Sequence, residues 1–170
     1  MLNKRVGSGF SMIELLVSVV IMSIGVLGMA GLQILSLQQN RSALLQGVAT
    51  QRGNDILERI RANPDTDYSG ISLTDTPVVT GSCIANSCSE SAMKDYDIAQ
   101  WQCSINSRDT DGSNYAVCDN FSISGTLPGG AGAISLNGGI YEVLVHWVDA
   151  QKVDDASGVT RSITIRAAAP

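Results

Sequence analysis

The feature that most constrains this chain is a long stretch near its N-terminus, from Leu15 to Asn40, that contains no charged residue and no proline. A helix needs about 20 apolar residues to cross the roughly 30 Å hydrocarbon core of a bilayer, and this stretch is long enough. Because lipid offers the backbone no hydrogen-bond partners, the segment is expected to be helical. The stretch therefore predicts one membrane-spanning helix.

The residues before this stretch carry only positive charge. Lys4 and Arg5 lie in residues 1–9, which hold no acidic side chain. Basic flanks stay in the cytoplasm, so the C-terminal part is expected in the periplasm. An ordinary secretory signal has an apolar region of about 7–15 residues with a small-residue cleavage site after it. Here the apolar run is longer and the small residues 7–9 precede it, which disfavours such a signal; a plain single-pass anchor remains open.

Glu14 is the residue that a plain anchor does not explain. It lies between Ile13 and Leu15, at the start of the apolar run. A carboxylate at the end of a membrane-spanning segment is costly and often marks a function. The residue therefore favours a chain that does more than attach to a membrane.

Residues 9–16, with the sequence Gly-Phe-Ser-Met-Ile-Glu-Leu-Leu, resemble the leader junction of type IV prepilins and type II secretion pseudopilins. In that family a membrane aspartyl protease, the prepilin peptidase, cuts after the glycine and methylates the new N-terminal amine. The resemblance implies cleavage between Gly9 and Phe10 and N-methylation of Phe10. It also implies a role in filament assembly for Glu14, through the N-terminal amine of a neighbouring subunit. The physics agrees, because a carboxylate and an amine desolvated together compensate each other, whereas either alone is costly.

The helical pattern continues beyond the membrane stretch. Residues 41–62 place apolar or small side chains at spacings near three and four, which predicts one face of an amphipathic helix. These residues are Leu45, Val48, Ala49, Gly53, Ile56 and Ile60. Asn63-Pro64 is the expected stop, since the residue before proline avoids the helical region. One helix of about fifty residues, roughly 75 Å long, is predicted.

The remaining residues, 63–170, are predicted to form one small domain. A short helix is expected near 89–106, with Ser87 and Glu90 as its capping box. Strands are expected at 115–123, 133–137, 140–148 and 159–167, with a loop at 127–132, a hairpin through Gly138-Gly139 and a turn at 154–158. On the strand 140–148, the side chains of Tyr141, Val143, Val145 and Trp147 are predicted to share one face.

The predicted fold class is α+β and type IV pilin-like: a long N-terminal helix packed on a small antiparallel sheet, with a short extra helix. The chain is expected to divide into a cleaved leader (1–9), a transmembrane and assembly helix (10–40) and a periplasmic globular domain (41–170). The last part includes the amphipathic half of the long helix.

Four further landmarks resemble the PilV type of minor pilin. They are residues 60–64 after the long helix, Asp97 with Trp101, residues 127–130 (Leu-Pro-Gly-Gly) and residues 145–149 (Val-His-Trp-Val-Asp). Their order along the chain carries the resemblance.

The four cysteines all lie in the part predicted to be periplasmic, where disulfides persist. Four cysteines allow three connectivities, and the sequence alone does not choose between them. Proximity favours Cys83–Cys88 and Cys103–Cys118 over the two long-range alternatives. A zinc site is disfavoured because the spacings match no Cys-x-x-Cys pattern, so no metal is expected.

The charge of the chain and its motifs point away from nucleic acid and catalysis. Without Lys4 and Arg5 the chain has nine basic and sixteen acidic side chains, a net charge of −7. That balance gives no support to nucleic-acid binding through a basic face. Residues 109–114 lack the order of an EF-hand and are expected to form a hairpin loop. His146 alternates with apolar residues in a strand. No nucleophile motif or phosphate loop is present, so neither an enzyme activity nor a cofactor is expected.

The resemblance implies a structural function. The expected role is that of a minor type IV pilin that primes pilus assembly or forms part of a tip complex, and so supports twitching motility, adhesion or DNA uptake. Its partners would be other minor pilins, the major pilin, the prepilin peptidase, the inner-membrane assembly platform and, before assembly, membrane lipid. It would lie in the inner membrane as a single-pass protein and then in the pilus at the cell surface. A minor pseudopilin of a type II secretion system and an anchored periplasmic binding module remain alternatives.

Overall fold

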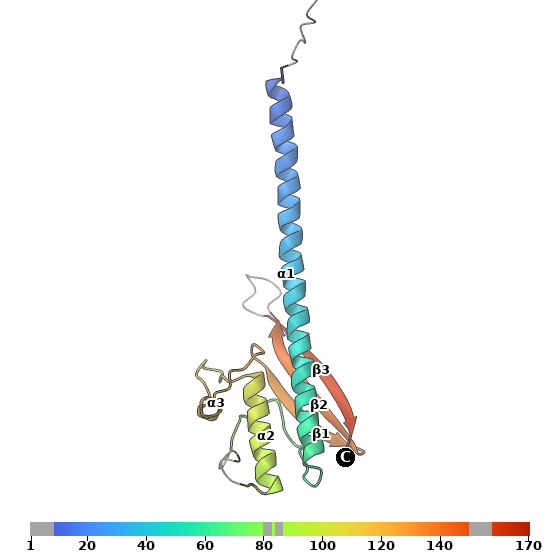
Figure 1. The fold of residues 1–170 in the computed structure, drawn as a ribbon, viewed down its shortest axis with the longest axis vertical. Helices are drawn as coiled ribbons and strands as arrows, with labels where there is room; N and C mark the ends of the chain where they lie inside the picture. Colours follow the sequence, from blue (N-terminus) through green and yellow to red (C-terminus); the bar gives the residue numbers. More distant parts are fainter. Residues whose placement is uncertain (1–8, 80–82, 84–86, 150–157) are drawn as a thin grey trace, which may run out of the picture. The chain divides into compact units, whose positions relative to one another are not determined.

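A computed structural model describes residues 9–79, 83, 87–149 and 158–170. Its elements in chain order are α1 (Met12–Ala62), α2 (Glu90–Ile105), α3 (Ala116–Phe121), β1 (Ala131–Asn137), β2 (Ile140–Asp149) and β3 (Val159–Ala168) (Figure 1). A long apolar helix, a small antiparallel sheet and short helices make the fold α+β and pilin-like, as predicted. The chain forms two compact units, one up to Asn40 and one from Arg41 onward.

The sheet has the order β1-β2-β3, and both pairs are antiparallel. The predicted hairpin is confirmed: Asn137 pairs with Ile140 across Gly138 and Gly139. Both glycines have positive φ, 58° and 76°, a conformation that glycine adopts at no steric cost. The three predicted strands from residue 133 onward are confirmed, each one or two residues longer than expected. The turn predicted at 154–158 lies, except for Gly158, outside the described residues.

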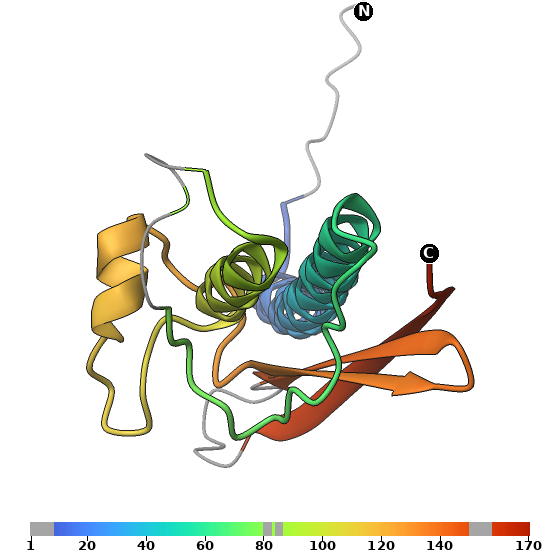
Figure 2. The same ribbon diagram turned by 90° about the horizontal axis from the view of Figure 1, so that it is seen from below.

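The core of the second unit lies between the sheet and two helices. Figure 2 shows α2 and the C-terminal part of α1 side by side on one face of the sheet. The predicted row of inward side chains on β2 is confirmed, because Tyr141, Val143, Val145 and Trp147 are all buried. The predicted face of α1 is confirmed except at Val48, which is only partly buried, and Leu57 is added to it. Its buried members are Leu45, Ala49, Gly53, Ile56, Leu57 and Ile60. The helix ends at Ala62, before Asn63-Pro64, as expected.

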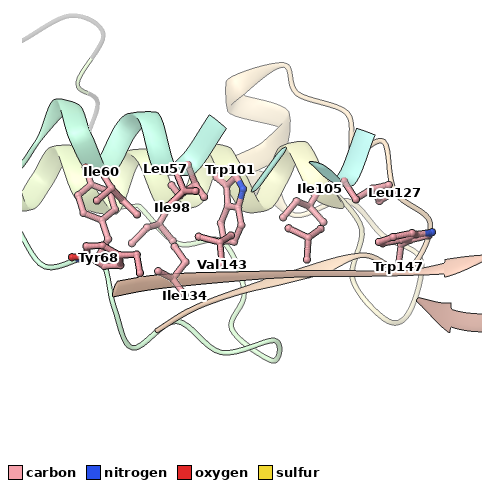
Figure 3. Close-up of a cluster of buried hydrophobic side chains, with 14 of the residues drawn as sticks. Leu57, Ile60, Tyr68, Ile98, Trp101, Ile105, Leu127, Ile134, Val143 and Trp147 are labelled. Carbon is pink, nitrogen blue, oxygen red and sulfur yellow. The ribbon is translucent and has the colours of Figure 1, made fainter. Parts of the chain in front are cut away.

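Two tryptophans from different elements belong to this core (Figure 3). Trp101 of α2 is fully buried, and its Nε1–H donates to the backbone oxygen of Arg52 at 2.8 Å. It lies so close to Gly132 that a Cβ atom there would clash with its ring. Trp147 of β2 is also buried, but its Nε1–H has no hydrogen-bond partner within the described part of the chain.

The strand predicted at 115–123 is wrong, because residues Ala116–Phe121 form the helix α3. The Cys118 N–H donates to the backbone oxygen of Tyr115 at 2.9 Å, which closes a helical turn. Ser122 then adopts a left-handed conformation with φ 55° and ends the helix. In a run of only nine residues, the spacing of the apolar positions cannot distinguish a short strand from a short helix.

The predicted capping residue of α2 is also wrong, by two residues. Ser89, not Ser87, precedes the helix, and its Oγ accepts from the Ala92 N–H at 3.3 Å. The helix itself, Glu90–Ile105, agrees with the predicted range. Ser87 and Ser89 lie on either side of Cys88, and serine is a favoured N-cap residue. The residue type therefore could not choose between the two positions.

Candidate functional site

The described chain begins at Gly9, and residues 9–11 lead directly into α1. Glu14 lies in the first turn of this helix. Its N–H and that of Leu15 both donate to the Ser11 backbone oxygen, at 3.0 and 3.3 Å. A carboxylate at this end of a helix is favoured by the helix dipole. The local sequence therefore places one negative charge at the N-terminus of a long apolar helix.

Neither Phe10 nor Glu14 is buried against other described residues of the chain. Phe10 is 78% exposed, and Glu14 is exposed and forms no ion pair with any described residue. The structure thus leaves this carboxylate free to meet a group from outside the chain.

The first part of α1 presents a continuous apolar surface. It contains an 18-residue window with a mean hydropathy of 2.4, and none of that window is buried. A soluble monomer rarely exposes a large contiguous apolar patch. By length and composition α1 can cross a membrane, and together with the motif at its start it fits anchoring in the inner membrane.

The second part of α1 is held to the domain by a polar cluster. Arg59 Nη1 donates to Asp97 Oδ1 at 2.9 Å and to Gln100 Oε1 at 3.0 Å. The other carboxylate oxygen of Asp97 accepts from the Tyr68 hydroxyl at 2.8 Å. Asn63 Nδ2 donates to the same hydroxyl at 3.1 Å. Burial raises the pKa of the Tyr68 hydroxyl, so it remains a donor at neutral pH.

A second aromatic hydroxyl extends the cluster to the sheet. The Tyr141 hydroxyl donates to Asp67 Oδ1 at 3.2 Å and accepts from the Tyr68 N–H at 3.3 Å. The pKa of Asp67 is lowered, first by the backbone N–H of Ser69 and then by the Ser69 side chain. The loop that follows α1 is therefore fixed to α2 and β2 by hydrogen bonds.

The four landmarks singled out in the sequence meet in two places. Asn63 and Asp97 both bind Tyr68, in the cluster just described. The Val148 N–H donates to the Pro128 backbone oxygen at 2.8 Å, which joins the other two. Gly129, the residue after Pro128, has φ +55°, and a Cβ atom there would lie 2.9 Å from Val148 Cγ2. The landmarks are thus residues that bind the helices, the loop and β2 to one another.

The structure joins Cys83 to Cys88 and Cys103 to Cys118, the two pairs that proximity favoured. Their Cα atoms lie 5.5 and 5.4 Å apart. The second bond ties α2 to α3, and both of its cysteines are fully buried. The two bonds leave no free cysteine in the described residues.

The described residues contain no group of three or more His, Cys, Asp or Glu side chains that could hold a metal ion. Residues 108–114 form a hairpin-like loop, as expected, with a bridge between Arg108 and Asn114. Within it, Asp111 accepts from the backbone and hydroxyl of Ser113, and the hydroxyl contributes most to lowering the Asp111 pKa. His146 is half-buried on β2, on the face opposite the core.

Sequence reasoning missed the residues that complete the cluster. Arg59, Tyr68 and Tyr141 come from a helix, a loop and a strand, and no periodic pattern links them. The available signal was Tyr68, which follows the helix stop at Asn63-Pro64 after three residues, in a chain with only four tyrosines. A buried tyrosine usually finds a hydrogen-bond partner.

Comparison with known families adds one match. Residues 4–30 match the prokaryotic N-terminal methylation motif. The match covers the leader junction, Glu14 and the first part of α1, and it supports a type IV prepilin-like N-terminus. No curated protein and no solved structure is significantly similar to the chain.

Proposed function

We propose that the chain is a minor type IV pilin, a structural subunit that primes pilus assembly or forms part of the tip complex. The observation that carries the proposal is the start of α1: a single carboxylate, Glu14, at the head of an exposed apolar helix, within residues that match the methylation motif. A helix with that surface requires lipid or other helices around it.

The proposed assembly step uses the charges at this end of the helix. After removal of residues 1–9, the N-methylated amine of Phe10 carries a positive charge. Glu14 of one subunit would then bind the amine of its neighbour as the helices leave the membrane and pack together. Truncating one partner of a buried ion pair costs roughly 3–5 kcal/mol, because the other charge is left uncompensated. The pair would therefore act as a condition for entry into the filament.

The location and partners belong to the same proposal. Lys4 and Arg5 would hold the leader in the cytoplasm, which places residues 41–170 in the periplasm. The proposed partners are of two kinds. The prepilin peptidase would process the chain, and the assembly platform, other minor pilins and the major pilin would bind it during assembly. Twitching motility, adhesion or DNA uptake would be the activities of the finished pilus. The two disulfides support an extracytoplasmic location for the domain.

A minor pseudopilin of a type II secretion system is the second candidate, since the methylation motif fits pilins and pseudopilins alike. A strain without the gene separates the two. Loss of sheared pili with normal secretion of enzymes supports the pilin, whereas the reverse result supports the pseudopilin.

The direct test of processing is mass spectrometry of the protein from its native membrane. We expect a mature chain that begins with N-methyl-Phe10. A bulky substitution such as Gly9→Leu should block cleavage, and Gly47→Ala, in open space on α1, serves as the control. Intact Met1 on the wild-type chain, in cells with an active prepilin peptidase, would overturn the proposal.

A further inference from the structure

β3 is the outer strand of the sheet, and its outer edge has no partner among the residues that the structure describes. It pairs with β2 over ten consecutive residues, Val159 to Ala168, in one unbroken register. The β1 side differs, because Ile71 bridges to Ile134 there. Among the described residues, β3 therefore has the longer uninterrupted open edge.

The register shows which backbone groups of β3 point outward. Ile134 exchanges hydrogen bonds with Ile71, so its N–H and C=O face away from β2. Its neighbour across the ladder, Val143, must then turn its own N–H and C=O toward β3, where it pairs with Ile165.

The Val143–Ile165 pair fixes the direction of the backbone N–H and C=O groups along β3, because this direction alternates from one residue to the next. Ile163, Ile165 and Ala167 bind β2, and the residues between them present their N–H and C=O to the open edge. Those residues are Thr160, Ser162, Thr164 and Arg166, and all four side chains are exposed. The Ala169 N–H agrees with this assignment, because it donates to the Gly139 backbone oxygen on the β2 side at 2.8 Å.

This edge lacks three of the features that normally prevent strand pairing, which are short length, proline and a bulge; its one charged edge position is Arg166. Its ten residues contain no proline and no break in register. Its two arginines bind back to β2: Arg161 to Asp149 at 3.0 Å and Arg166 to Glu142 at 2.7 Å. The edge positions 160, 162 and 164 carry hydroxyl side chains, two of them threonine, which suits a strand.

We propose that the β3 edge accepts a β-strand donated by a different polypeptide, which extends the sheet to four strands. The apolar side chains of the donated strand would lie beside half-buried Ile163 and Ile165, and its polar side chains beside Ser162 and Thr164 on the outer face. Antiparallel pairing with β3 of a second copy would reverse residues 41–62 of one α1 relative to those of the other. The two Arg41 ends would then face opposite ways, although both chains must continue from there into the same membrane. That exclusion rests on the proposed function.

The test uses proline as a backbone-specific substitution. Thr164→Pro removes one N–H from the open edge and leaves the β2–β3 hydrogen bonds intact, since proline is tolerated where the N–H faces outward. Thr164→Ala is the matched control, because it removes the hydroxyl and keeps the N–H. A photo-crosslinking amino acid at Ser162 of the full chain, in its native cells, reports the partner.

We expect a crosslink to a different protein, mapped by mass spectrometry to a segment with alternating apolar and polar residues. Thr164→Pro should reduce the crosslink about five-fold or more, the equivalent of one lost hydrogen bond, and Thr164→Ala should leave it unchanged. A crosslink that Thr164→Pro does not weaken, or no crosslink in cells where the protein functions, overturns the proposal. A crosslink to a second copy, or a disulfide-linked dimer of Thr164→Cys, also overturns it.

Hydrogen exchange provides a reading that needs no variant. In the purified full chain in micelles, the amides of Ser162 and Thr164 should exchange fast, while those of Ile163 and Ile165 are protected. In the native assembly all four should be protected. Edge amides that stay unprotected there contradict the proposal, even if Thr164→Pro fails to fold. If the chain is processed at Gly9 and its edge stays open, this inference alone fails; if it is not processed, the proposed function fails.

Discussion

Arg59 and Asp97 form the ion pair that joins α1 to α2, with Nη1 and Oδ1 2.9 Å apart. The side chains are 27% and 12% exposed, so water screens the pair only in part. Asp97 also accepts from the Tyr68 hydroxyl, and one carboxylate thus serves a helix and a loop. This shared use makes Asp97 more important to the domain than an ordinary surface acid.

Asp97→Asn should lower the free energy of unfolding by about 1–3 kcal/mol, because hydrogen bonds to a charged acceptor are replaced by weaker ones. Urea unfolding of the full chain in micelles, followed by near-ultraviolet circular dichroism, measures the change. The control is Glu58→Gln, which breaks the exposed pair with Arg61 and should change stability by less than about 1 kcal/mol. Equal effects of the two substitutions would contradict the role of the cluster.

Glu14→Ala tests the charge at the head of α1. The variant should still be cut after Gly9 and should remain in the inner membrane, because alanine suits both a helix and lipid. It should fail to enter sheared filaments, or fail to restore piliation to a strain that lacks the gene, since the neighbouring amine loses its partner. Immunoblots of membrane and sheared fractions provide the measurement. Glu58→Ala, also on α1, is the control, and normal piliation with Glu14→Ala would remove the assembly role.

Cys118→Ser should lower the free energy of unfolding by about 2–5 kcal/mol, the usual cost of losing a native disulfide from a small domain. Cys88→Ser should cost less, because the bond that it breaks closes a loop of only five residues against fifteen. Thermal unfolding of the two variants compares them. Non-reducing peptide mapping of the wild type should show Cys103 linked to Cys118; a Cys83–Cys103 or Cys83–Cys118 peptide would contradict this pairing.

Gly132→Ala should destabilise the domain by about 1–3 kcal/mol, because the added methyl group enters space that the Trp101 ring fills. Gly47→Ala is the matched control: its methyl group meets open space on α1, and alanine is the better helix former. Its effect should be neutral or stabilising. Chemical unfolding of both proteins decides the prediction, and a similar loss in each would show that the contact with Trp101 is unimportant.

The fold was predictable wherever one periodic pattern extended over many residues. The apolar face of α1 and the alternation of β2 each involve several buried positions, so a shift in register would have exposed them to water. The failure at α3 has the opposite cause. That helix has only six residues and one buried side chain, Cys118, and a disulfide rather than a hydrophobic pattern fixes its place.

The polar cluster could not be predicted for a different reason. Arg59 and Asp97 are 38 residues apart in the chain, and a contact of that kind depends on how two helices pack. The candidate site at the N-terminus differs from this cluster, because its residues are neighbours in the sequence. Residues 9–16 predict roles for Gly9, Phe10 and Glu14 from the sequence alone, and the structure adds that this segment is exposed.

The two tryptophans lie in different environments and can therefore serve as intrinsic spectroscopic probes of the domain. The chain has only two indole groups, and one N–H is bonded to the Arg52 oxygen while the other has no such bond within the described residues. A nitrogen-15 side-chain spectrum should therefore contain two well-separated resonances, one sensitive to the junction of α1 with α2 and the other to the end of β2. Without any attached dye, each resonance would follow its own region through micelle, membrane and filament.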